Sequence, residues 1–260
     1  MRRLYDYRDL IYTLVMRDLK VRYRRSFLGF LWSMLQPLLT MVVLHVVFST
    51  LFVMELKGTG IRNYPVFVLS GILFYNFFQQ SIVSSMNSLR ANASILQKLP
   101  VPMAVFPLAS VLSGLVNLFL SLVPLLGLLI VTGHPLGLQL FFLPVAILIA
   151  TLFTLGAGLL LAPLSIFFTD VVEMVNVGLM LFFYLTPIIY PKKIVEAHPL
   201  YWMVRYNPIR SILEVFRDPI HLSKIPPLSH LSVSLVIALI ALAIGTWAFH
   251  KTSDRIPFYI

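Results

Sequence analysis

The sequence predicts an all-α polytopic membrane protein, and three observations lead to this fold class. Of its 260 residues, 59% are hydrophobic and only 12% are charged, whereas a soluble domain carries about 25% charged residues and has too little interior to bury so much apolar side chain. Six stretches are apolar over the roughly 20 residues that a helix needs to cross a bilayer. Eight of the twenty lysines and arginines lie in the first 27 residues, which is typical of a cytoplasmic flank.

The N-terminal segment 1–27 is expected to form a helix at the membrane interface. Between residues 4 and 24, apolar and charged residues alternate at helical spacing without reaching the hydrophobicity of a span. Such a pattern is typical of a helix that lies in the membrane surface. A plain basic flank that only sets orientation is the alternative. A cleaved signal peptide is not favoured, because Asp6, Asp9 and Asp18 stand among the arginines and the following apolar run is too long.

Six spans are expected, at about 28–54, 64–84, 104–131, 139–163, 171–190 and 229–250. The fifth is the least regular, because it contains Glu173 and Asn176 and ends in Thr186-Pro187. The basic flank places the N-terminus in the cytoplasm, and six spans return the C-terminus to the same side. With no internal repeat and no soluble segment, residues 1–260 form a single transmembrane domain.

The segment 191–228 is rich in proline and aromatic residues and too apolar for a simple loop. Ile209, Ile212, Leu213 and Phe216 follow helical spacing. We expect short helices that dip into the outer interface before the last span. The six basic residues of this segment conflict with the orientation rule, which disfavours positive charge outside.

Polar residues follow one face of the second span. Asn76, Gln79, Gln80 and Asn87 share that face at about 100° per residue. Amide side chains are costly in lipid, so this face meets water, another helix or a partner subunit. It therefore lines a pore or forms hydrogen-bonded helix packing. Small residues in the third and fourth spans, such as Gly114 and Gly158, predict packing seams.

Several classes of chemistry find no support. The chain has no cysteine, no phosphate-binding loop of an ATPase, and no metalloprotease or serine-hydrolase motif. Asp170 and Glu173 would share a helix face, which leaves a membrane enzyme acting on lipid-linked sugars as an alternative. No basic stripe with interleaved aromatics lies beyond the N-terminal flank, so nucleic acid is not an expected partner. Energy for uphill transport would come from another protein.

Four passages of the sequence form a recognisable set. They are residues 17–26 with Leu28-Gly29, Leu31-Trp32 and Gln36-Pro37; Asn92 with residues 96–100 and Pro102; residues 168–171; and residues 186–191 with Tyr206-Asn207-Pro208 and Phe216-Arg217. They resemble the membrane permease of type 2 ABC exporters, above all the branch that exports O-antigen, capsule and teichoic-acid polysaccharides. They extend in the family's order over nearly the whole chain, although Thr169 stands where the family often has arginine.

The resemblance implies a homodimeric channel of two six-helix subunits in the bacterial inner membrane. Two cytoplasmic ABC ATPase subunits would bind ATP and magnesium, and this chain would hold neither a cofactor nor a metal. The resemblance also implies an amphipathic interface helix at the N-terminus, a cytoplasmic coupling helix at about 87–101, and re-entrant outer helices before the last span.

The expected activity is ATP-driven export of a lipid-linked polysaccharide, with export of a drug or lipid, a membrane enzyme and a scaffold as alternatives. An interfacial belt is the alternative role for the aromatic candidates. The expected channel-lining residues are Gln36, Tyr75, Asn76, Gln79, Gln80, Tyr184, Tyr190 and Trp202. The residues expected to couple to the ATPase are Arg17, Arg22, Arg24, Arg25, Arg90, Asn92, Gln97, Lys98 and Asp170.

Overall fold

The computed structural model describes residues 4–23, 28–51, 61, 63–135, 137–196, 198–199 and 201–259. Within these ranges the chain is helical and contains no strand, which confirms the predicted fold class. The elements are η1 (Leu4–Tyr7), α1 (Arg8–Tyr23), α2 (Leu31–Leu51), α4 (Tyr64–Ala91), α5 (Ala93–Lys98), α6 (Val105–Val131), η2 (Leu138–Phe142), α7 (Leu143–Phe167), α8 (Val171–Leu185), α9 (Lys192–Val195), α10 (Tyr201–Arg205), α11 (Pro208–His221), α12 (Leu228–Ser253) and η3 (Ile256–Phe258).

Five helical segments are long and apolar enough to cross a membrane: Leu31–Phe48 of α2, α4, α6, Leu138–Phe167 of η2 and α7, and α12. They match five of the six expected spans, and the protein is therefore a multi-pass membrane protein. The fifth expected span, 171–190, contains α8, which has 15 residues. At 1.5 Å per residue this is about 22 Å, short of a hydrocarbon core of about 30 Å. A sixth crossing stays a prediction.

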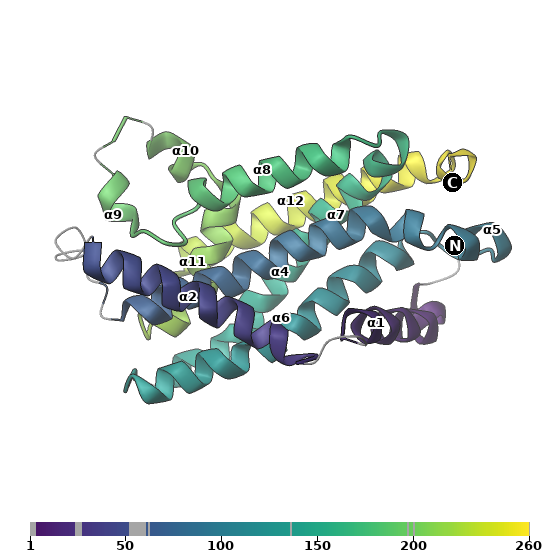
Figure 1. Ribbon diagram of the computed structural model, residues 1–260. Coiled ribbons are helices and arrows are strands. Elements are labelled where there is room, and N and C mark those ends of the chain that lie inside the picture. The colour runs from purple at the N-terminus through teal and green to yellow at the C-terminus, as the bar shows by residue number, and fades with distance from the viewer. Residues whose placement is uncertain are drawn as a thin grey trace.

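The long helices run side by side in one bundle with α4 at its centre (Figure 1). Over an apolar stretch of 18 residues in each helix, 78% of the residues are buried in α4, against 11% in α2 and 17% in α12. Val43 of α2 and Trp247 of α12 are among the many large apolar side chains that remain exposed. The bundle thus buries α4 against protein, whereas α2 and α12 keep an apolar outer surface that suits lipid or a partner.

Small residues allow close helix contacts, as the sequence predicted. Where α7 meets α12, a Cβ at Gly245 would overlap the carbonyl oxygen of Gly156. A Cβ at Gly114 of α6 would overlap the hydroxyl of Ser81 on α4. These helices approach closely because glycine contributes no side chain at either contact, which is the usual basis of helix association in lipid.

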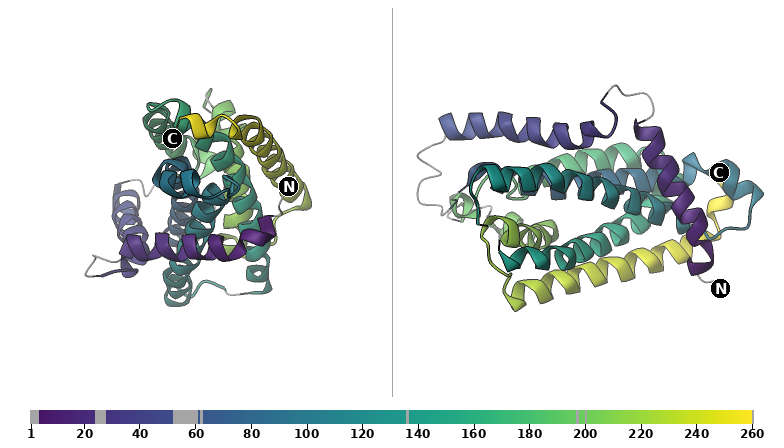
Figure 2. Two further views of the ribbon diagram at one scale, coloured as in Figure 1. Left: turned by 90° about the vertical axis from the view of Figure 1, so that its right-hand side faces the viewer. Right: turned by 90° about the horizontal axis from the view of Figure 1, so that it is seen from below.

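Helix α1 lies across one end of the bundle, where α5 and η3 are also found (Figures 1 and 2). We call this the terminal end, and the end with α9 and α10 the opposite end. The expected N-terminal helix is confirmed, but Leu10, Leu14 and Val15 of α1 pack against an apolar cluster that includes Phe106 of α6. Protein, and not lipid alone, covers part of its apolar face.

Three short helices, α9, α10 and α11, occupy the segment 191–228, as expected. The apolar side of α11 is buried, with Ile212, Leu213 and Phe216 at 0% exposure. This helix packs on α4, α7 and α12. Whether these helices re-enter the membrane stays a prediction.

Candidate functional site

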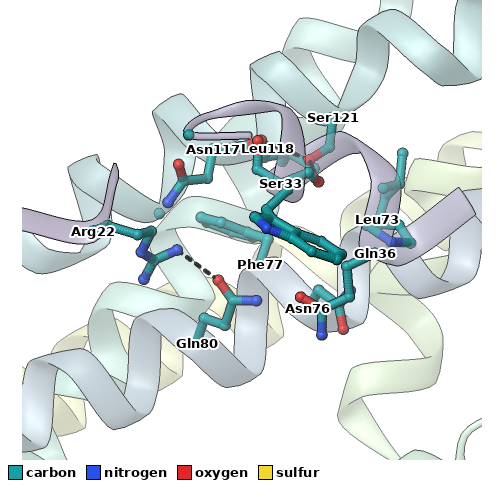
Figure 3. Close-up of a pocket in the computed structure, with 14 residues that line it drawn as sticks. Arg22, Ser33, Gln36, Leu73, Asn76, Phe77, Gln80, Asn117, Leu118 and Ser121 are labelled. Carbon is teal, nitrogen blue, oxygen red and sulfur yellow. Dashed lines mark hydrogen bonds between the residues drawn. The ribbon is translucent and has the colours of Figure 1, made fainter. Parts of the chain in front are cut away.

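A polar cavity of about 350 Å³ lies between α2, α4 and α6, beside the end of α1 (Figure 3). Six of its fourteen lining residues carry an amide or a hydroxyl, which contrasts with the apolar composition of the helices that carry them. The lining residues are Arg22, Gly29, Trp32, Ser33, Gln36, Pro37, Leu73, Asn76, Phe77, Gln80, Gly114, Asn117, Leu118 and Ser121.

Two local features shape the α2 side of this first cavity. Gly29 has a φ of +51°, a conformation that glycine adopts without steric cost, just before α2 begins. Pro37 lies inside α2 and lacks the N–H that would bond to the carbonyl of Ser33. The hydroxyl of Ser121 on α6 donates to that carbonyl at 2.9 Å. The proline thus frees an acceptor in α2, and α6 satisfies it.

Two further cavities adjoin the first and extend it toward the terminal end. A cavity of about 480 Å³ shares Arg22, Gln80, Gly114 and Asn117 with the first and reaches α1. A cavity of about 250 Å³ then continues past Asn87 of α4. Because consecutive cavities share lining residues, we describe the three together as the polar groove. The second and third cavities share Arg17, Asp18, Ser84, Ala91 and Ser110.

The polar stripe of α4 faces this groove. Asn76 and Gln80 line the first cavity and Asn87 lines the third, and Gln36 of α2 joins Asn76 and Gln80 in the first. Gln79 is half-buried and lines none of the three. Three of the expected channel residues, Gln36, Asn76 and Gln80, are therefore brought together.

Helix α1 is joined to α4 and to the turn that follows it by two hydrogen bonds from arginine. Arg22 donates to Oε1 of Gln80 at 2.9 Å (Figure 3). Arg17 donates to Oδ1 of Asn92 at 2.6 Å and forms an ion pair with Asp18 at 2.9 Å. Arg22, which was expected to couple to an ATPase, thus contacts Gln80, which was expected to line the channel.

The aromatic candidates lie elsewhere. Tyr75 is 1% exposed, its hydroxyl donates to the carbonyl of Leu179 on α8, and it lines none of the three cavities. Tyr184 and Trp202 are each 56% exposed, and the hydroxyl of Tyr190 donates to the carbonyl of Tyr184 at 2.8 Å. The structure does not bring these four residues to the polar groove.

The remaining coupling candidates lie near the ends of helices. Arg90 donates to the carbonyl of Ser165 at 2.9 Å, and the exposed Asp170 accepts from Thr169 at 3.3 Å. Gln97 and Lys98 are exposed on α5, whose six residues fall inside the expected coupling helix 87–101. Arg24 and Arg25 lie outside the described residues.

A buried arginine near the start of α4 was not among the expected site residues. Arg217 of α11 is 5% exposed, donates to the carbonyls of Pro187 (2.7 Å) and Ile188 (3.1 Å), and lies 4.0 Å from the ring centre of Phe67. It fixes the chain after α8. Helical spacing could have identified Arg217 as buried, because it lies eight residues after Ile209 and therefore on the apolar side of α11.

Asn207 and Tyr64 hold the same segment. The side-chain amide of Asn207 donates to the hydroxyl of Thr186 at 2.9 Å, and its Oδ1 accepts from the backbone N–H of Ile209 at the start of α11. The hydroxyl of Tyr64 donates to the carbonyl of Ile189 at 2.7 Å. Arg217 and Tyr64 thus satisfy the carbonyls of residues 187–189, which follow the end of α8, and Asn207 joins Thr186 to the start of α11.

Comparison with known proteins gives a consistent result. A model of the ABC-2 type transporter family matches residues 9–221. The chain is 30% identical over 248 residues to the O-antigen export system permease protein RfbA of Klebsiella pneumoniae, covering 95% of this chain and 93% of that protein. It is 31% identical to RfbA of Myxococcus xanthus, with 98% and 96% covered. It is 23% identical to the polysialic acid transport protein KpsM of Escherichia coli, with 93% and 92% covered.

Proposed function

Since the chain belongs to the ABC-2 type transporter family, we propose that it is the channel-forming permease of an ATP-driven exporter of lipid-linked polysaccharide, of the O-antigen or capsule kind. The observation that carries the proposal is the polar groove, a row of amides and hydroxyls inside an otherwise apolar bundle. Relatives named as O-antigen and polysialic acid transport proteins point to a sugar polymer.

The groove suits sugars because their hydroxyls both donate and accept hydrogen bonds. Gln36, Asn76 and Gln80 carry amides, which offer two donors and an acceptor each. Gln36 is exposed at the edge of the first cavity. We therefore propose that a second copy of the chain closes the channel in a homodimer, and that Tyr184, Tyr190 and Trp202 lie near its exit. Gln79, expected in the channel from its helical spacing, and Tyr75 line none of the three cavities, so the proposed channel does not include them.

The energy is proposed to come from two ABC ATPase subunits, because the sequence has no phosphate-binding loop of its own. Those partners would hold ATP and magnesium at the cytoplasmic side. We place the terminal end there, in the bacterial inner membrane, because the basic N-terminal segment favours the cytoplasm. The ATPases would contact Arg90, α5 and Asp170, and Arg24 and Arg25 stay coupling candidates on the basis of the sequence alone.

Force would then reach the groove through α1. Arg17 binds Asn92, directly after α4, and Arg22 binds Gln80 within the groove. Through these two contacts, a movement of α1 and of the α4–α5 turn would displace residues of the first cavity. This supports a coupling role for both arginines.

The test is gentle purification of the tagged chain from its native membranes, together with deletion of its gene. We expect an ABC ATPase to co-elute in equal amounts, and deletion to abolish surface polysaccharide while lipid-linked polymer accumulates inside the cell. Normal surface polysaccharide after deletion would refute the polysaccharide assignment. A chain that elutes alone and turns over lipid-linked sugars without ATP would indicate the membrane enzyme instead.

A further inference from the structure

We propose that the first cavity, with Arg22 as its cationic group, binds a phosphate carried by a lipid headgroup. The inference rests on the proposed function and deepens it, because it assigns a binding site to the lipid end of a lipid-linked substrate. Its basis is the charge of the cavity, its hydrogen-bond donors and its depth in the bundle.

The charge of the cavity is positive and unbalanced. Arg22 is its single charged lining residue, and among the described residues Arg22 forms no ion pair with a carboxylate. Its one hydrogen bond to a described residue goes to the neutral amide of Gln80. In the adjoining cavity, Arg17 is neutralised by Asp18 at 2.9 Å. Arg22 would therefore be the group that attracts an anion entering the groove.

The donors around Arg22 suit a phosphate. A guanidinium has five N–H donors in a planar fork that matches phosphate oxygens, and Gln80 occupies one nitrogen, Nη1. Asn76, Gln80 and Asn117 add amide groups to the same lining. The first cavity offers no carboxylate to repel an anion. Its volume of about 350 Å³ lies within the usual range of small-ligand sites.

The position of the cavity favours a lipid headgroup over a soluble anion. Its α2 side is the first two turns of that helix, Trp32 to Pro37, and the first turns of a span lie near the membrane boundary. Trp32 is 47% exposed there, in the manner of an interfacial aromatic. Helix α1, which supplies Arg22, lies across the bundle at the same end (Figure 2). Lipid phosphates are found at this depth.

The experiment measures binding of a radiolabelled polyprenyl diphosphate to the purified full-length chain in dodecyl maltoside, a detergent without phosphate. We expect Arg22→Gln to weaken binding about tenfold, as loss of a charged hydrogen-bond partner does. The matched control is Lys20→Gln, which removes the same charge from an exposed position of α1 that lines none of the three cavities. It should bind like the wild type.

A second variant tests whether reduced binding comes only from the lost charge or from misfolding. Asn76→Leu removes an amide from the cavity without changing its charge, and we expect it to weaken binding severalfold while the elution profile stays that of the wild type. Unchanged binding by Arg22→Gln, or an equal loss in Lys20→Gln, would overturn the proposal.

Competitors distinguish the sources of the phosphate. The phosphate-free polyprenol should not displace the probe, and displacement by it would refute a phosphate site. Preference for the polyprenyl diphosphate over phosphatidylglycerol would identify the substrate carrier, and equal displacement would identify bilayer phospholipid; both support a lipid phosphate. Displacement by inorganic pyrophosphate as effective as that by the lipid would overturn the lipid assignment.

The outcome is separable from that of the proposed function. Surface polysaccharide that persists without the gene would refute export whatever the binding result. Wild-type binding by Arg22→Gln, combined with an export defect on gene deletion, would refute only the headgroup site.

Discussion

At Pro37, α2 loses a backbone N–H, and the hydroxyl of Ser121 on α6 serves the carbonyl of Ser33 in its place. A backbone carbonyl without a hydrogen-bond partner inside a helix bundle is costly, so the hydroxyl of Ser121 replaces the missing N–H. One hydroxyl thus lets a proline stand at the polar groove and fixes the distance between two helices.

We predict that Ser121→Ala lowers the stability of the protein by about 1 kcal/mol, the usual contribution of one hydrogen bond. The same change in a Pro37→Ala background should cost less, because residue 37 then supplies its own N–H to Ser33. Thermal unfolding of the four proteins in micelles gives the coupling. Ser232→Ala, at an exposed hydroxyl of α12 that bonds locally, is the control, and equal losses in both backgrounds would contradict the account.

Asp218 of α11, outside the five candidate spans, provides a pH test. Burial raises its pKa to about 6 from an ordinary 3.8, and the neighbouring Glu214 acts in the same direction, against Lys192, His230 and Arg217. The folded protein therefore holds this proton more tightly than the unfolded chain does. Its ionisation makes a destabilising contribution that is absent below about pH 4 and grows as the pH rises through about 6.

Asp218→Asn should remove that contribution. We expect the variant to match the wild type near pH 4 and to be more stable by on the order of 2 kcal/mol at pH 7.5. Melting temperatures of both proteins across this range test it, and their difference isolates Asp218 from the opposite effect of His221, whose pKa burial lowers to about 4. A difference that does not change with pH would contradict the prediction.

Among the elements, α4 shows how much a helical pattern predicts. The spacing predicted one polar face for Asn76, Gln79, Gln80 and Asn87, and all of these except Gln79 line the groove. Tyr75 was assigned to the channel by residue type, yet it is adjacent to Asn76 and so points about 100° away. It is buried against α8 instead. Spacing defines a face, but the neighbouring helices decide what that face meets.

We predict that Gln80→Leu impairs polysaccharide export at normal expression, because it removes an amide from the groove and the partner of Arg22. Its comparator is Gln79→Leu, the same change one residue away and outside the three cavities, which should export near the wild-type level. Surface polysaccharide per cell measures both. An equal defect in the two variants would show that the channel extends beyond the groove.

The limits of the helices were predictable only in part. Hydropathy indicated an end of the second span near 84, whereas α4 continues to Ala91. The last part of the helix contains serine and asparagine, so hydropathy alone does not detect it. The fifth span was expected to reach 190, but α8 ends at Leu185, where Pro187 cannot continue the hydrogen-bond pattern. Arg217 and Asn207 then bind the carbonyls and hydroxyl that follow, a tertiary arrangement that no local pattern contains.

For the whole molecule, the seam between α7 and α12 joins the last helix to the bundle. A Cβ at Gly245 would meet the backbone of Gly156, whereas a Cβ at Gly127 of α6 would meet open space. We predict that Gly245→Ala destabilises the protein by about 1–3 kcal/mol through overpacking. Gly127→Ala should be neutral or stabilising by up to about 1 kcal/mol, because alanine favours helix. Melting temperatures in micelles measure both, and similar shifts would contradict the close seam.

The two chain ends lie at the same end of the bundle (Figure 1). In the proposed orientation, with the terminal end at the cytoplasm, a gene encoding two copies in tandem would need only a flexible glycine-serine linker and no additional crossing. Such a fused pair allows a substitution to be placed in one half while the other half stays wild-type. The contribution of a single Arg22 or Gln80 to a two-subunit assembly then becomes measurable.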